Sequence, residues 1–184
     1  MKIVLGIGNV GEKFEKSYHN VGFMVIDELA KRVNATISKK TENAFILEAK
    51  IGNEKVIIVK PTTYVNLSGE ALVRVMKMFD VSIEDVIVAV DDIDMPVGKV
   101  RYRVSGTSGT HNGLRNIVLN AKSENFKRIK IGIGRNFQMR LDEFVLSKIT
   151  ETDFVEIEKA VDKAVRFLIG IFEGQNDENV NVTM

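Results

Sequence analysis

Short apolar runs and stretches with helical spacing alternate along the whole of this 184-residue chain. The run at 2–7 is almost continuously apolar up to glycine, a pattern typical of a strand buried on both faces. Helical spacing first appears at 20–33, where Val21, Val25 and Leu29 recur every four residues. The pattern predicts strands at 2–7, 44–51, 55–60, 85–90, 99–104 and 128–134, and helices at 20–33, 68–79, 112–121 and 150–172.

Interleaved strands and helices predict an α/β fold with one central sheet flanked by helices. A Gly52-Asn53 turn joins two of the strands into a hairpin, so we expect a mixed, mostly parallel sheet. Asn20 and Thr150 each precede a helix and are predicted N-caps. With no linker or repeat in the pattern, we expect residues 1–184 to form a single domain, with a frayed polar tail at 175–184.

Composition narrows the class of protein. The chain is 45% hydrophobic and has no cysteine, which excludes a disulfide framework and a thiolate nucleophile. No apolar run approaches the roughly 18 residues of a membrane span, and the amino-terminal segment lacks the features of a signal peptide. We therefore expect a cytoplasmic protein with no membrane partner.

The net charge is only +1, but the charges segregate along the chain. Residues 141–184 hold ten acids and four bases. Residues 99–140 hold ten bases against one acid, Glu124, which predicts a basic face that meets phosphate, with an ordinary solvated surface as the alternative. The bases are Lys99, Arg101, Arg103, Arg115, Lys122, Lys127, Arg128, Lys130, Arg135 and Arg140.

A glycine-rich turn, Gly6-Ile7-Gly8-Asn9-Val10-Gly11, follows the first strand. It matches the dinucleotide fingerprint, but charged, aperiodic residues 12–18 follow where that fingerprint needs a helix. We favour an open turn that presents Asn9 at the carboxyl ends of the strands, and retain a nucleotide-dependent oxidoreductase as an alternative.

The only two histidines both precede asparagine, in His19-Asn20 and His111-Asn112. Imidazole exchanges protons near neutral pH, whereas carboxamides are fixed donors and acceptors. This pairing indicates acid–base chemistry on a polar, uncharged group. The alternative is that the imidazoles only cap helices or brace loops.

Asp91 ends an apolar strand, so we expect it at the same edge of the sheet as Asn9. There its carboxylate could accept a ring N–H and fix the tautomer of a histidine. A polar turn before Pro96 is the alternative. No histidine has a ligand partner at metal-motif spacing, so we expect no metal site. Asn66 and Asn112, like Asn9, lie beside element ends, where they could either converge on one rim or cap helices.

Six blocks occur together and in order between residue 3 and about residue 146, and with them the chain resembles bacterial peptidyl-tRNA hydrolases. The blocks are Gly6-Ile7-Gly8-Asn9-x-Gly11, His19-Asn20-x-Gly22, Lys60-Pro61-x-Thr63-Tyr64-x-Asn66-x-Ser68-Gly69, Asp91-Asp92-x-Asp94-x-Pro96-x-Gly98, His111-Asn112-Gly113-Leu114 and Arg128-x-x-x-Gly132-Ile133-Gly134-Arg135.

The resemblance implies an esterase, usually monomeric and free of cofactors, that cleaves the ester between a peptide and the 3′ ribose of tRNA. In that family pattern His19 is the general base and Asp91 orients its ring. The residues that bind the peptide, or support the polar groups that do so, would be Asn9, Tyr64, Asn66, His111 and Asn112. Those that bind tRNA phosphates would be Arg103 and Arg135. A non-catalytic RNA-binding protein of the same fold is the rival interpretation.

The chain departs from the family pattern without losing a proposed catalytic group. The departures are Ser17-Tyr18 for Thr-Arg, Val65 for Met, Thr110 for Gly, Val10 for Pro and Phe14 for Tyr.

Overall fold

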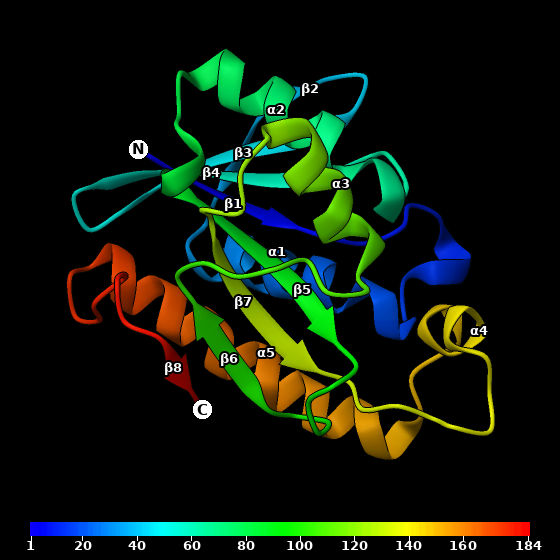
Figure 1. Ribbon diagram of the computed structural model, residues 1–184. Helices are drawn as coiled ribbons and strands as arrows, with labels where there is room; N and C mark the ends of the chain where they lie inside the picture. Colours follow the sequence, from blue (N-terminus) through cyan, green and yellow to red (C-terminus); the bar gives the residue numbers. More distant parts are fainter.

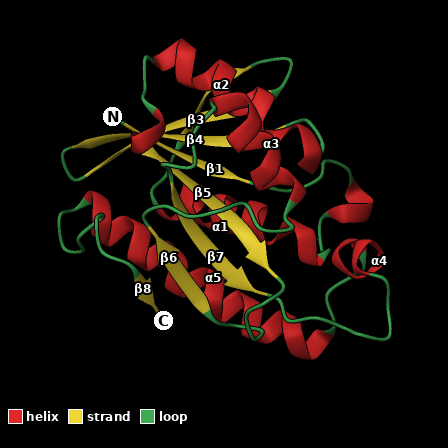
Figure 2. Cartoon of the chain, in the orientation of Figure 1, coloured by secondary structure: helices red, strands yellow, loops and turns green.

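The computed structural model describes all 184 residues as one eight-stranded sheet with helices on both faces (Figures 1 and 2). The strand order is β2-β3-β4-β1-β5-β7-β6-β8. Only β3 and β6 pair antiparallel with both neighbours, so the other six strands point one way. The predicted mixed, mostly parallel sheet of a single α/β domain is therefore confirmed. The strands are β1 (Lys2–Gly6), β2 (Thr36–Lys40), β3 (Ala44–Ile51), β4 (Glu54–Pro61), β5 (Val86–Asp92), β6 (Val100–Arg103), β7 (Lys127–Gly132) and β8 (Val182–Thr183).

Two pairs of helices cover the sheet. Helices α1 (Val21–Arg32) and α5 (Glu151–Phe172) pack together on one face, and α2 (Ser68–Phe79) and α3 (Asn112–Ala121) on the other (Figure 1). The short helix α4 (Leu141–Leu146) stands apart beyond the carboxyl end of β7.

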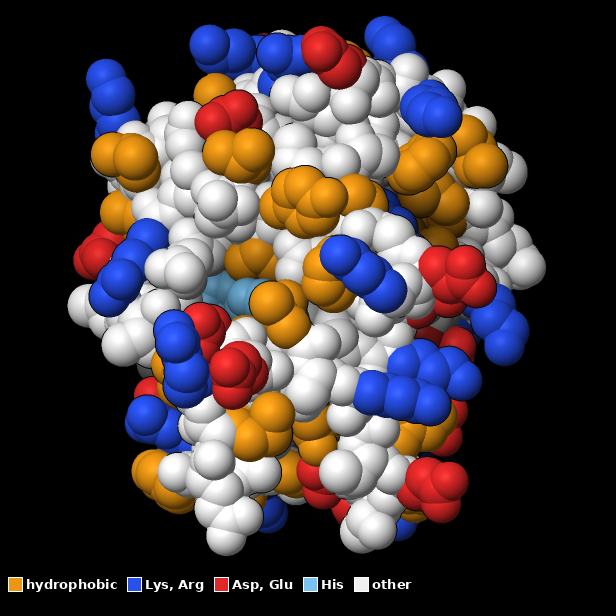
Figure 3. Space-filling view, turned by 90° about the vertical axis from the view of Figure 1, so that its right-hand side faces the viewer, with side chains coloured by type: hydrophobic (Ala, Val, Ile, Leu, Met, Phe, Trp, Pro, Cys, Tyr) orange, Lys and Arg blue, Asp and Glu red, His pale blue; other side chains and the backbone are white.

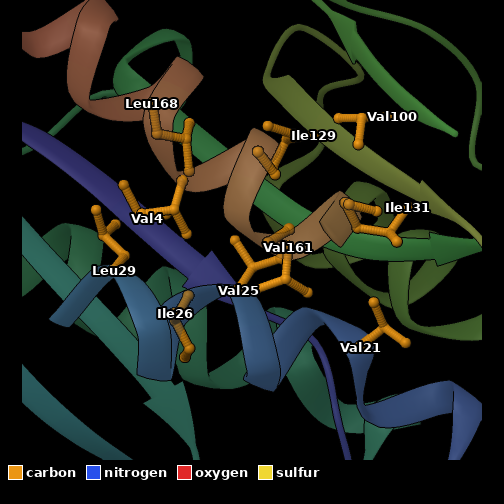
Figure 4. Close-up of a cluster of buried hydrophobic side chains, with 14 of the residues drawn as sticks. Val4, Val21, Val25, Ile26, Leu29, Val100, Ile129, Ile131, Val161 and Leu168 are labelled. Atoms are coloured by element: carbon orange, nitrogen blue, oxygen red, sulfur yellow. The ribbon is translucent and has the colours of Figure 1, made fainter. Parts of the chain in front are cut away.

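The central strands are buried on both faces because their side chains alternate between two apolar clusters. Val4 points into the cluster under α1 and α5, whereas Ile3 and Leu5 point into the cluster under α2 and α3. Figure 4 shows the first cluster, in which Val25 and Leu29 of α1 face the sheet together with Val161 of α5. This two-sided burial explains the continuous apolar runs of β1 and β5.

Two sequence-based expectations are wrong. The side chain of Asn20 makes no cap hydrogen bond, because its amide pairs instead with the backbone of Asn9. The polar tail is not frayed at its end, since β8 pairs with β6 and the backbones of Met184 and Val100 bond to each other. The pattern also missed β2, all of whose residues are exposed, and the six-residue helix α4. Thr150 does cap α5, accepting a hydrogen bond from the N–H of Asp153.

None of the helices combines the length and the apolar character that crossing a membrane requires.

Close packing of α1 against the sheet depends on Gly22. A Cβ atom at this position would lie 2.4 Å from the carbonyl oxygens of both Ala89 and Ile7. We expect Gly22→Ala to lower the free energy of unfolding by about 3 kcal/mol, the upper part of the range for overpacked cores. Urea denaturation measures this loss.

Gly170→Ala is the matched control, because its Cβ would meet only the side chain of Asn176 and would cost no more than the hydrogen bond from that side chain to the carbonyl oxygen of Phe167, about 1 kcal/mol. The packing argument fails if both variants unfold at the same urea concentration.

Candidate active site

The carboxyl ends of the parallel strands bring the predicted chemistry together. β1 and β5 are neighbours, so the turn after β1 and the end of β5 reach the same edge of the sheet. His19 lies in a short 3₁₀ helix, Tyr18–Asn20, directly before α1, and His111 lies directly before α3. Because α1 and α3 cover opposite faces, the two imidazoles approach Asp91 from the two sides of the sheet.

Asp91 forms the centre of the site. Its side chain is 1% exposed and contacts both rings: Nδ1 of His19 lies 2.9 Å from Oδ1 and 3.1 Å from Oδ2, and Nε2 of His111 lies 3.0 Å from Oδ1. The two ring centroids are 4.9 Å apart. The contact between the first histidine and Asp91, expected from the strand-end argument, is therefore present.

The backbone fixes the tautomer of His111. Its Nδ1 accepts hydrogen bonds from the N–H groups of Gly113 and Leu114, at 3.1 and 3.3 Å, and so caps α3. An acceptor nitrogen carries no proton, so the ring proton is on Nε2 and is donated to Asp91. The helix-capping alternative is thus correct for His111, which supports the carboxylate with its other nitrogen.

His19 is held the other way round. Its Nδ1–H donates to Asp91, and Nε2 has no partner within the protein. Burial acts to lower the pKa of His19, but the charge of Asp91 and the hydrogen bond to it outweigh burial and raise that pKa above its ordinary value. The free Nε2 is therefore a basic nitrogen whose orientation is fixed by its neighbour.

Burial acts to raise the pKa of Asp91, yet the two histidines hold it far below its usual range. A lowered carboxylate pKa contributes stability that is present above about pH 4 and is lost as the pH falls. The raised pKa of His19 contributes stability that is complete below about pH 6.5 and is lost as the pH rises through its folded value. The pair is consequently most stabilising between these limits.

Asn9 presents a fixed amide beside the triad of His19, Asp91 and His111. Its Oδ1 accepts from the N–H of Val65 at 2.9 Å, and its backbone N–H and C=O bond to the side chain of Asn20 at 2.8 and 2.9 Å. Only Nδ2 of Asn9 remains without a protein partner. The sequence pattern did not predict that Asn20 supports Asn9, because the position of Asn20 before α1 is typical of an N-cap.

Asn66, Tyr64 and Asn112 differ from Asn9 in being exposed, and the two asparagine side chains make no hydrogen bond within the protein. Asn66 lies in the 3₁₀ helix Val65–Leu67, which packs against α3. These three side chains are therefore available to a ligand along the side of the site formed by α3.

A pocket of about 440 Å³ opens at the triad. A histidine side chain is visible at the bottom of this hollow, with charged and apolar side chains around it (Figure 3). His19, Asp91, His111 and Asn112 line it, whereas Asn9, Tyr64 and Asn66 do not. Its opposite wall includes Leu141, Val145 and Leu146 of α4, a helix that the hydrophobic pattern did not predict.

Basic side chains gather on one face of β6 and β7. Arg101 is directly opposite Lys130, and Arg103 is directly opposite Arg128, so four cations share this face. Asp92 compensates Lys130 at 2.9 Å and Arg128 is buried, so Arg101 and Arg103 are the partly exposed arginines of this group. Arg135 follows the carboxyl end of β7 and is not part of this group, so the structure places the two predicted phosphate-binding arginines at opposite ends of that strand.

The histidines and Asp91 are also the one cluster whose residue types and spacing could hold a metal, with their ligand atoms within 4.8 Å of one another. Both ring nitrogens directed at Asp91 are used in hydrogen bonds to it, and the other nitrogen of His111 caps α3. A cation would have to displace these hydrogen bonds, so the donor set fits a hydrogen-bonded triad better than a metal centre.

The glycine-rich turn serves packing rather than a dinucleotide. A Cβ on Gly6 would lie 2.5 Å from the carbonyl oxygen of Gly22, and one on Gly8 would lie 2.6 Å from the ring of Phe23. These glycines let α1 approach β1 closely, which argues against the oxidoreductase alternative.

Comparison with known proteins agrees with this geometry. The family model for peptidyl-tRNA hydrolase matches residues 3–183. A peptidyl-tRNA hydrolase of Finegoldia magna is 42% identical over 184 residues, covering 100% of this chain and 95% of that protein. A peptidyl-tRNA hydrolase of Bacillus subtilis is 43% identical over 167 residues, covering 90% of this chain and 89% of that protein. The crystal structure of the peptidyl-tRNA hydrolase of Acinetobacter baumannii superimposes with a TM-score of 0.89 at 30% identity, covering 95% of this chain and 90% of that one.

The electrostatic coupling in the triad can be tested without any substrate. We expect Asp91→Asn to lower the pKa of His19, because burial then acts without the opposing charge. NMR titration of the ring protons measures this, and the presence of only two histidines makes the assignment simple. Long-range ¹H–¹⁵N spectra recorded above the raised pKa of His19 should also show the Nδ1–H tautomer for His19 and the Nε2–H tautomer for His111.

Asp94→Asn is the control, since it removes the same charge from an exposed position at the pocket that touches neither ring. An equal shift of the His19 pKa in both variants would contradict a direct role of Asp91.

Proposed function

The chain belongs to the peptidyl-tRNA hydrolase family, and we propose that it hydrolyses the ester between a peptide and the 3′-terminal ribose of tRNA with His19 as general base. The observation that carries this assignment is the free Nε2 of His19 at the bottom of the pocket, with Nδ1–H bonded to Asp91. An imidazole held in this way is suited to deprotonate water.

The reaction then proceeds as ordinary ester hydrolysis. Nε2 of His19 takes a proton from water while the water oxygen bonds to the ester carbonyl carbon. The carbon–oxygen bond to the ribose breaks next, and the ribose oxygen takes the proton back from His19. The products are a peptide carboxylic acid, which loses its proton to water, and a tRNA with a free terminal hydroxyl. Asp91 stabilises the transient imidazolium throughout.

The carbonyl oxygen becomes negatively charged during the attack, and fixed amide donors stabilise such an oxyanion. Asn112 lines the pocket and its amide is free, which supports assigning it to the oxyanion or to the attacking water. Nδ2 of Asn9, together with Asn66 and Tyr64 along the adjacent rim, would hold the peptide backbone. His111 supports the reaction indirectly, because its ring is used to cap α3 and to bind Asp91.

The tRNA would lie along the basic face of residues 99–140. The two partly exposed arginines of β6, Arg101 and Arg103, would neutralise phosphates, and Arg135 would do so beside the pocket. The reaction needs no cofactor, and we propose that the protein acts as a cytoplasmic monomer on tRNA released from ribosomes.

Removal of the base tests the reaction. We expect His19→Ala to reduce kcat/KM for N-acetyl-aminoacyl-tRNA by about 10²–10⁴-fold, the usual contribution of a general base. Release of the N-acetyl-amino acid measures the rate, and thermal unfolding together with tRNA retention on a filter shows whether the variant is folded. The base assignment is wrong if a folded variant keeps the full rate. The non-catalytic RNA-binding alternative predicts tRNA retention without turnover by the unsubstituted protein.

The phosphate assignment predicts a change in salt dependence. Each lost phosphate contact lowers the slope of log affinity against log salt by about 0.7–0.9. We therefore expect Arg103→Ala to weaken tRNA binding at low salt and to reduce that slope by about 1, as filter binding at several salt concentrations would show. Arg166→Ala, which changes an exposed arginine on α5 on the other side of the sheet, is the control and should leave the slope unaltered. Identical slopes for both variants would place the tRNA elsewhere.

A further inference from the structure

Phe137 is the most exposed large apolar side chain in the protein, with 84% of its surface accessible. It lies in the loop between β7 and α4. The guanidinium of Arg135 sits over its ring, 5.0 Å from the ring centroid. One face of this aromatic ring is thus paired with a cation, while the side chain as a whole remains open to solvent.

The loop that carries Phe137 ends at the active-site pocket. Leu141 and Asp142, the first residues of α4, line the pocket together with His19. Between residues 133 and 141 the loop contains two arginines, Arg135 and Arg140, and no acid. Arg140 binds the carboxylate of Asp142 at 3.0 and 3.2 Å, so Arg135 supplies the positive charge beside the aromatic ring at the edge of the site.

This combination suits single-stranded nucleic acid. Proteins bind unpaired nucleotides by stacking bases on aromatic side chains while basic groups bind the backbone, and arginine adds to the stacking. The carbonyl carbon attacked at His19 is joined to the terminal ribose, so the nucleotides that precede it must leave across the rim of the pocket. The opposite rim, with Asn66 and Tyr64, has the neutral polar character that suits a peptide.

We propose that Phe137, backed by Arg135, stacks an unpaired base at the 3′ end of the RNA part of the substrate. This inference rests on the proposed function and adds to it a binding residue for nucleobases. The other occupant that the loop could accept, an apolar side chain of the peptide, is an outcome that the following tests separate.

The chain contains no tryptophan, so Phe137→Trp would introduce a single fluorescent reporter at the position in question. A short RNA ending in CCA should quench this tryptophan in a saturable manner, because stacked bases quench indole emission. An abasic RNA of the same length and charge should not quench it. Ile37→Trp is the matched control, since Ile37 is 76% exposed on β2 at the opposite edge of the sheet.

Steady-state kinetics provide the second readout. Phe137→Ala should raise KM for N-acetyl-aminoacyl-tRNA by between about 5-fold and 160-fold, the range for loss of one stacked base, with little change in kcat. Phe137→Tyr should restore KM, whereas Phe137→Leu should not. Met139→Ala, in the same loop, should behave like the unsubstituted protein.

The inference is overturned if RNA that demonstrably binds does not quench Phe137→Trp, or if Phe137→Leu is as active as Phe137→Tyr, which would indicate a merely apolar contact. Failure of the proposed function looks different: the unsubstituted protein would then not hydrolyse the ester, whereas failure of this inference alone leaves that hydrolysis intact.

Discussion

The carboxylate of Asp91 is a negative charge that the fold buries almost completely at the end of a central strand. A buried charge is costly unless hydrogen bonds compensate it, and here two imidazole N–H groups do so. The same two bonds determine where the imidazoles can lie. Because one ring precedes α1 and the other precedes α3, a single carboxylate links helices from both faces of the sheet.

The two histidines are not equivalent, and the difference comes from the backbone. His111 uses one nitrogen for Asp91 and the other for the first N–H groups of α3, so both its nitrogens are occupied. His19 has no helix N–H groups to bind, and its second nitrogen is left for chemistry. The N–H donors at the start of α3 thereby leave Nε2 of His111 as the nitrogen that donates to Asp91.

Local patterns predicted the parts of this arrangement that depend on a single segment. Apolar runs located β1 and β5, and the rule that parallel strands end at one sheet edge brought Asp91 and His19 together correctly. Capping by His111 was stated only as an alternative, because caps are usually Ser, Thr, Asp or Asn. The prediction for Asn20 failed for the opposite reason. Its residue type and position are typical of a cap, but its amide hydrogen-bonds to the backbone of Asn9 instead. Strands β2 and β8 carry no apolar signal, because one is exposed throughout and the other has only two residues.

The departures from the family pattern acquire a physical meaning in the structure. Tyr18, where the family has arginine, is buried: its ring packs on Phe144 of α4 with centroids 4.6 Å apart, and its hydroxyl donates to Asp153 at the start of α5. Burial and the hydrogen bond to Asp153 raise the pKa of this tyrosine, so it stays neutral and apolar at physiological pH. Tyr18, next to the base, thus carries no charge and instead packs on α4, which connects the turn that holds His19 directly to that helix. Since α4 forms one wall of the pocket, the position of that wall and the orientation of the base depend on the same side chain.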